Sequence, residues 1–195
     1  MRKFLFTVAF VISICSPILG QLKQEDIKLY PEDTTNVVKV VLESKLDKQA
    51  TYRGIKEFLV KKLPEGVKAI ELDDIDNGLL VAKSVRPLHS KRFVKGSLEY
   101  EMLSDVSYTL TVEVKDNRFR LKYEDMFVQQ IMKCKGMPDT PLKPQSMEKL
   151  ANNIAKGDPI DPFIIFDSEC REMVRAFIAD LSNAINVSVS SFDDF

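Results

Sequence analysis

Apolar and polar residues alternate most regularly near the middle of the chain, over residues 108–114 and again over residues 119–123. A period of two is typical of a β-strand that buries one face. A two-residue turn at residues 116–117 would bring the apolar positions of the two segments opposite each other and would pair Glu113 with Arg120. The pattern therefore predicts an antiparallel hairpin with the Glu113–Arg120 pair on its solvent side.

The part of the chain before this hairpin predicts a strand, a helix and two further strands. β-Branched residues are concentrated in Val37–Leu42, which favours a strand. Thr51 is a suitable N-cap for a helix whose apolar residues recur at spacings of three and four until Pro64, which cannot continue a helix. Two more strands are expected, Val67–Leu72 and Leu79–Val85, and the register between them is left open.

After the hairpin, the pattern predicts a loop, a short helix and a long closing helix. Three prolines fall within residues 136–144, which favours a loop, and residues 146–156 read as a short helix. The closing helix is expected to begin near Asp167 or Ser168, and residues 188–195 are expected to be a frayed tail. The predicted buried stripe of this helix consists of Met173, Val174, Phe177, Ile178, Leu181 and Ile185.

The first twenty residues have the pattern of a secretory signal peptide. Arg2 and Lys3 precede an apolar run of about 11 residues, whereas a helix needs roughly 20 to cross a bilayer. We expect cleavage after Gly20, export to the periplasm or the cell exterior, and no transmembrane segment in the mature chain. A lipid anchor at Cys15 is disfavoured because Ile14, which precedes it, is large.

The charge balance, length and cysteine content of the chain limit the classes of function that it can have. Removal of the signal leaves 26 of the 28 basic residues against 29 acidic ones, so nucleic-acid binding is not expected, because it needs Lys and Arg to neutralise phosphates. About 175 residues is the usual size of one domain. The mature chain has two cysteines, Cys134 and Cys170, and an oxidising compartment permits a disulfide between them. Two unpaired buried thiols are the alternative.

The predicted order of strand, helix, four strands and helix resembles the TBP-like fold, named after the TATA-box-binding protein. Three parts are similar to a family of secreted bacterial domains of unknown function, typical of Bacteroides and its relatives. They are Tyr52–Leu63, the acidic turn Asp74–Gly78 with Leu79–Ala82 after it, and Tyr108–Tyr123. The resemblance implies an α+β domain in which the first and last helices pack on a curved antiparallel sheet. It brings no established activity, and TATA-box recognition does not follow from a fold.

The sequence departs from the family pattern in two places. Lys83–Pro87 replaces an expected glycine-containing motif and is followed by a long connection to Ser104, and residues 127–167 look like a Pro-rich insertion with an extra short helix. The expected organisation is a signal peptide at 1–20, a polar leader at 21–36, a single domain at 37–187 and a tail at 188–195.

The residues most used in catalysis and metal binding are scarce. The one histidine, His89, lies in a polar stretch and is expected to be a solvated loop residue. No phosphate loop, zinc-type histidine pair, nucleophile elbow or cysteine cluster is present, so we assign no catalytic residue, metal or cofactor. Asp73, Asp74, Asp76 and Asn77 offer oxygens suited to calcium, but the spacing of a helix-loop-helix calcium site is absent and a solvated turn is preferred.

Basic residues are the one site-like feature of the sequence. Five of them fall within thirteen residues: Lys83, Arg86, Lys91, Arg92 and Lys95. The candidate binding face consists of Arg118, Arg120, Lys122, Arg86 and Arg92. A basic face on an acidic protein suits an anionic polysaccharide, a lipid head group or an acidic protein partner. The plainer interpretation is a solubilising surface that protects an edge strand.

The leading hypothesis is a secreted or periplasmic, non-enzymatic binding or envelope-associated module, with an unknown envelope protein or an anionic polysaccharide as its partner. The alternative is a carboxylate-based hydrolase acting on an envelope or extracellular substrate. It requires two of Asp73, Asp74, Glu99 and Glu101 to converge in a cleft with raised pKa values. A mainly structural partner of a neighbouring secreted protein is a third possibility, which the sequence does not separate from the first.

Overall fold

The computed structural model describes residues 38–88, 91–95, 98–146, 161–185 and 187–191. The strands are β1 (Val38–Glu43), β2 (Ile70–Asp74), β3 (Leu79–Pro87), β4 (Lys91–Lys95), β5 (Leu98–Lys115), β6 (Arg118–Cys134), β7 (Thr140–Pro141), β8 (Gln145–Ser146) and β9 (Ser188–Ser191). The α-helices are α1 (Lys48–Lys62) and α3 (Asp161–Ile185), and a 3-10 helix, η3, spans Gly66–Ala69.

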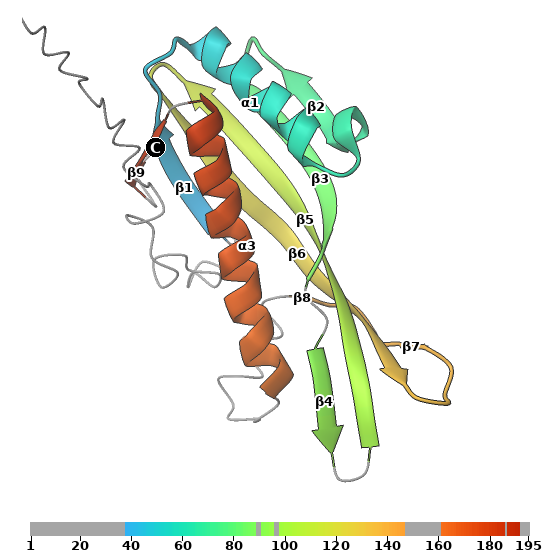
Figure 1. Ribbon diagram of the computed structural model, residues 1–195. Coiled ribbons are helices and arrows are strands. Elements are labelled where there is room, and N and C mark those ends of the chain that lie inside the picture. Colours follow the sequence, from blue (N-terminus) through green and yellow to red (C-terminus); the bar gives the residue numbers. More distant parts are fainter. Residues whose placement is uncertain (1–37, 89–90, 96–97, 147–160, 186, 192–195) are drawn as a thin grey trace, which may run out of the picture.

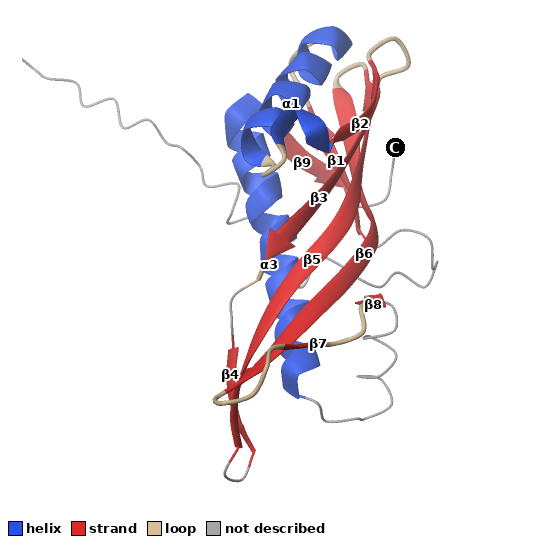
Figure 2. Ribbon diagram, turned by 90° about the vertical axis from the view of Figure 1, so that its right-hand side faces the viewer, coloured by secondary structure: helices blue, strands red, loops and turns tan. Residues whose placement is uncertain are grey.

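One antiparallel sheet forms the body of the described part of the protein, and α1 and α3 both lie on the same face of it (Figures 1 and 2). The strand order is β2-β3-β5-β6-β1-β9, with β4 beside β5, and β7 and β8 beside β6. The five main strands and two helices follow the predicted chain order of strand, helix, four strands and helix. The core lies between the sheet and the two helices.

The β5–β6 hairpin has the predicted register. Leu110 pairs with Tyr123, and Glu113 pairs with Arg120. Asn117, the second residue of the turn, has a φ of 63°, a left-handed conformation that asparagine tolerates better than most residues. Alternation and turn chemistry therefore specify the same register.

Both strands of this hairpin are longer than the alternation indicated. β5 begins at Leu98 and pairs with β4, so the stretch between Arg86 and Ser104 contains a strand and is not one long connection. Residues 127–134 likewise continue β6 and are not part of an insertion. A bulge near Asp125, which has a φ of 50°, bends the ladder there without ending it.

Helix α1 begins four residues before the predicted position. Asp47 is the N-cap, and its carboxylate accepts a hydrogen bond from the Ala50 N–H at 2.7 Å. Thr51 is buried inside the first turn, where its hydroxyl lies 2.7 Å from the Ser44 hydroxyl. Both Asp and Thr are good N-cap residues, and here the N-cap is the exposed Asp47 and not the buried Thr51. The helix ends before Pro64, as predicted.

The hairpin between β2 and β3 is confirmed, with a shorter first strand. Residues 66–69 form η3, so β2 starts at Ile70 and not at Val67. The pairing of Asp74 with Leu79 fixes the register that the sequence left open.

Gly78 is the last residue of the turn of this hairpin and has a φ of +70°. A Cβ atom there would lie 2.3 Å from the Val114 carbonyl oxygen. The Gly78 carbonyl also accepts a hydrogen bond from the Val114 N–H at 2.7 Å. Only glycine allows this close approach of the turn to the end of β5.

Helix α3 begins at Asp161, before the predicted start at Asp167 or Ser168. Pro162 suggested a break, but proline is tolerated in the first turn of a helix, where backbone N–H groups have no partner within the helix. The predicted stripe is confirmed: Met173, Val174, Phe177, Ile178 and Leu181 are buried, and Ile185 is half-buried. Phe177 contacts the rings of Phe58 and Tyr123 edge to face.

Residues 188–191, which were expected to be frayed, form β9 and pair with β1. The predicted signal peptide, the predicted leader and His89 lie outside the described residues. So does the short helix predicted for residues 146–156, apart from Ser146 in β8.

Candidate functional site

Three of the predicted basic residues lie on the outer face of the sheet, away from the helices. Arg118, Arg120 and Lys122 alternate along β6 with Phe119 and Leu121, which are buried in the core on the opposite face.

The charges of this outer face are largely engaged. Arg120 and Lys122 both form ion pairs with the Glu113 carboxylate, and the three side chains are 18–26% exposed. Burial raises the pKa of Glu113, but hydrogen bonds from Lys122 and Arg120 outweigh burial and hold the pKa below its ordinary value. Two positive charges therefore share one negative charge, which weakens their attraction for a polyanion.

The five predicted residues do not form one face. Arg86 pairs with buried Val106 across the ladder, and therefore lies on the face covered by the helices. Arg92 pairs with Glu101, roughly 40 Å along β5 from Glu113 at about 3.3 Å per residue. Successive side chains of a strand alternate between its two faces, and β3 continues as far as Arg86. The prediction of a single basic face is therefore wrong.

The two aspartates of the hydrolase hypothesis have structural partners. Asp73 accepts a hydrogen bond from the Tyr52 hydroxyl at 2.8 Å and forms an ion pair with Lys56. The hydrogen bonds from Lys56 and Tyr52 lower the pKa of Asp73. Asp74 accepts hydrogen bonds from the side-chain amide and backbone N–H of Asn77, which lower its pKa. The hypothesis requires raised pKa values, so neither aspartate meets it.

Glu99 and Glu101 lie near the other end of β5. They share one face, and with Arg92 and Lys133 they line a hollow of about 340 Å³. Glu99 and Glu101 therefore share one hollow with two basic residues, apart from Asp73 and Asp74.

No disulfide joins Cys134 and Cys170 in the structure. Cys170 is buried in the core and packs as a small apolar residue. Within the described residues, no three His, Cys, Asp or Glu side chains are grouped so that they could hold a metal ion. In the same part of the chain, neither α-helix combines the length and the apolar character needed to cross a membrane.

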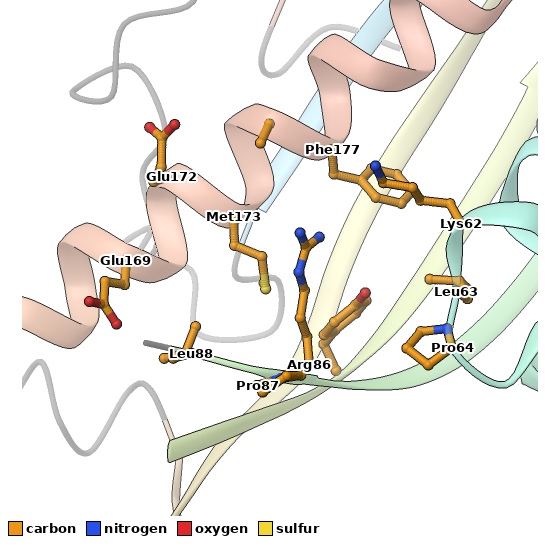
Figure 3. A pocket seen from close by; sticks show the side chains of 12 residues that line it. Lys62, Leu63, Pro64, Arg86, Pro87, Leu88, Glu169, Glu172, Met173 and Phe177 are labelled. Atoms are coloured by element: carbon orange, nitrogen blue, oxygen red, sulfur yellow. The ribbon is translucent and has the colours of Figure 1, made fainter. Parts of the chain in front are cut away.

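A pocket of about 570 Å³ lies between the end of α1, the end of β3 and α3 (Figure 3). This volume is within the range of sites that bind small molecules. The apolar lining consists of Leu63, Pro64, Pro87, Leu88, Met173, Ala176 and Phe177. The polar lining consists of Lys62, Arg86, Tyr108, Glu169 and Glu172.

The unequal reach of the two helices creates this pocket. The helices meet where the Cβ position of Gly54 lies 3.0 Å from the Ile185 side chain, and where Phe58 contacts Phe177. Pro64 then ends α1, whereas α3 extends further along the sheet toward its own N-terminus (Figure 1). Of the two described α-helices, only α3 flanks the inner face of β3 beyond this point.

Arg86 is the notable polar residue of the pocket. Figure 3 shows its half-buried side chain pointing from β3 into the space between Met173 and Lys62. Among the described residues, no carboxylate lies within ion-pair distance of its guanidinium group. The other charged residues have partners: Lys62 pairs with Asp180, and Glu172 pairs with Arg175 at 2.7 Å.

Tyr108 lines the same pocket from β5. Burial raises the pKa of its hydroxyl, although a hydrogen bond with Ser84 and the positive charge of Arg86 oppose this effect. Its hydroxyl is therefore neutral near pH 7. Within the described residues, the pocket thus combines an apolar wall, an arginine without a carboxylate partner and a neutral phenol.

The alternation of residues along β3 indicates the position of Arg86, which the distribution of charges along the sequence does not. Leu80, Ala82, Ser84 and Arg86 occupy every second position of β3, and the first three are buried. Continuation of the alternation to residue 86 places an arginine on the apolar face of the sheet. The contribution of α3 could not be inferred in this way, because it requires the tertiary packing.

Comparison with known proteins supports the fold. Residues 38–129 match a family described as a domain of unknown function (DUF4468) with TBP-like fold. The crystal structure of a DUF4468 family protein from Bacteroides ovatus is similar with a TM-score of 0.57 and 12% identity, over 89% of this chain and 99% of that one. A TBP-like protein from Parabacteroides distasonis gives a TM-score of 0.56 and 17% identity, over 80% and 96% of the two chains. No curated protein matches the chain.

These matches confirm the family resemblance predicted from the sequence. Because the sequence identities are only 12% and 17%, the similar structures support the fold and not a function.

Proposed function

We propose that this chain, whose residues 38–129 match the DUF4468 domain with a TBP-like fold, is a non-enzymatic binding module of a bacterial envelope whose ligand occupies the pocket at Arg86. The observation that carries the proposal is a half-buried arginine that has no carboxylate partner among the described residues and lies in a mostly apolar pocket. A charge that is partly removed from water without a partner is unfavourable for folding, and a ligand that pairs with it offsets this cost.

The envelope location is supported by the N-terminal sequence. Two basic residues, a short apolar run and a small residue at position 20 are the features of a secretory signal. This part of the proposal is tested by the N-terminal sequence of the protein recovered from its host. A mature N-terminus at Gln21 supports export, and an intact Met1 in the cytoplasmic fraction contradicts it.

The pocket is a better candidate site than the outer basic face. Arg120 and Lys122 already share Glu113, so a polysaccharide or an acidic envelope protein would have to compete with an existing ion pair. Arg86 has no such competitor among the described residues. The outer face therefore serves as the comparison in the experiment.

The test is to incubate the purified protein with a small-molecule extract of the bacterial envelope, separate the protein by size, and identify the compounds that stay with it by mass spectrometry. Wild type is compared with Ala176→Trp, which fills the pocket, and with the triple-alanine variant of Arg118, Arg120 and Lys122. Circular dichroism establishes that both variants are folded.

The expected result is a compound that wild type and the triple variant retain and that Ala176→Trp loses. A compound lost only in the triple variant would move the site to the outer face. A protein that retains no compound in any form contradicts the proposal.

A further inference from the structure

We infer that the pocket takes a monoanionic amphiphile, with a singly charged carboxylate-type head group on Arg86 and a compact apolar body along α3. This inference rests on the proposed function and names the chemical class of its ligand. Three features of the pocket lead to it: the isolation of Arg86, the charge balance around it, and the composition of the wall.

The head group is assigned from Arg86. Its guanidinium group points into the pocket and has no carboxylate partner among the described residues. A guanidinium group presents parallel N–H donors that match the two oxygens of a carboxylate, and such charge-assisted pairs are stronger than neutral hydrogen bonds. Tyr108 lines the same pocket with a neutral hydroxyl, which is a further polar group for the head.

The charge of the ligand is assigned from the neighbours of Arg86. Lys62 is committed to Asp180, so one positive charge is available in the described lining. Glu172 also lines the pocket but is paired with Arg175, as Lys62 is with Asp180. The Glu169 carboxylate in the same lining disfavours additional negative charge on a ligand. One negative charge therefore matches Arg86, whereas a polyanion would place further negative charge beside Glu169.

The apolar character of the ligand body is inferred from the apolar residues that line the pocket. Figure 3 shows Leu88, Met173 and Phe177 around the space that Arg86 enters. Most of the residues of the lining are apolar, so burial of a hydrocarbon body against them is favourable. Methionine adapts its shape to irregular contacts, which suits Met173 for packing against such a body.

The inference is tested with three probes that share a ten-carbon body and differ in the head group: decanoate, decanol and decyltrimethylammonium. Binding to the purified protein is measured by isothermal titration calorimetry, below the micelle concentration of the two charged probes and below the solubility limit of decanol. Decanoate should bind about tenfold or more tightly than decanol, because its head group forms the charged pair with Arg86. The cationic probe should bind more weakly than decanol. Acetate, which lacks the body, should not bind measurably.

Two variants assign the charged pair to Arg86. Arg86→Gln should reduce the affinity for decanoate about tenfold and leave the affinity for decanol unchanged, and Arg86→Lys should lie between wild type and Arg86→Gln. Arg118→Gln removes the same charge from the outer face and is the matched control, with no expected effect on either probe.

Decanol binding as tightly as decanoate would overturn the inference, as would equal effects of Arg86→Gln and Arg118→Gln. Absence of decanoate binding would also overturn it. If an envelope compound is nevertheless retained by wild type and lost in Ala176→Trp, the proposed function stands and only the ligand class is wrong. If no compound is retained either, both fail.

Discussion

Replacing Tyr123 by Phe should make the protein more stable, although a large buried side chain is being altered. Tyr123 is 1% exposed, and its hydroxyl has no hydrogen-bond partner among the described residues. Burial raises the pKa of this hydroxyl well above its ordinary value, with a smaller contribution from Tyr108. Folding therefore removes the hydroxyl from water and gives it no hydrogen bond in return.

The size of the stability change in Tyr123→Phe depends on the cost of burying this hydroxyl without a hydrogen bond. An unpaired buried polar group costs about 1–3 kcal/mol, and deletion of one oxygen leaves a small void that costs about 1 kcal/mol or less. The free energy of unfolding should rise by about 1 kcal/mol, which corresponds to an increase of about 2–4 °C in Tm for a chain of this size.

Tyr52→Phe is the matched control, because Tyr52 is also 1% exposed but donates hydrogen bonds to Asp73 at 2.8 Å and to the Leu79 carbonyl at 3.2 Å. Loss of these bonds should lower the free energy of unfolding by about 1–2 kcal/mol. Urea titrations of wild type and the two variants, followed by far-ultraviolet circular dichroism, measure both changes. Equal destabilisation by the two substitutions would refute the reasoning, since it would mean that the Tyr123 hydroxyl contributes a favourable interaction.

Three further predictions concern the turn, the outer face and the thiols. Gly78→Ala should lower the free energy of unfolding by about 2 kcal/mol or more in urea titration, whereas Gly136→Ala, also at positive φ but with open space around it, should cost about 1 kcal/mol. Because ion pairs lower the pKa of Glu113 in the folded state, their stabilisation is present above about pH 4.3 and is lost as the pH falls further. Glu113→Gln should therefore show a smaller loss of Tm between pH 6 and pH 3 than wild type. Cys134→Ser should leave the urea midpoint unchanged, and titration of the unfolded, unreduced protein with a thiol reagent should detect both Cys134 and Cys170, because no disulfide joins them.

The parts of the fold that the sequence predicted are those where two local signals agree. At the β5–β6 hairpin, the alternation and the two-residue turn specify one register, and Asn117 adopts a left-handed conformation that asparagine tolerates. The first half of β5 was missed because Leu103 lies on the outer face and Ser104 is buried, which interrupts the apolar alternation. The start of α3 was missed because Pro162 is read locally as a break.

The candidate site was predicted less well than the fold, because it depends on which face of the sheet each basic side chain lies on. Arg118, Arg120 and Lys122 alternate with core residues, so their outward position could be inferred from the sequence. Their shared pairing with Glu113 could be inferred only in part, through the cross-strand contact of Arg120. The position of Arg86 required knowing how far β3 extends, and the pocket around it depends on how α3 crosses the sheet.

The position of β1 affects the order in which the domain can be completed. β1 follows the leader near the start of the chain, yet it lies between β6 and β9, and β9 contains some of the last residues. A chain that emerges from its N-terminus cannot finish this side of the sheet until its C-terminal end is also released. During synthesis, the edge of β1 that faces β9 therefore stays open until residues 188–191 have been made.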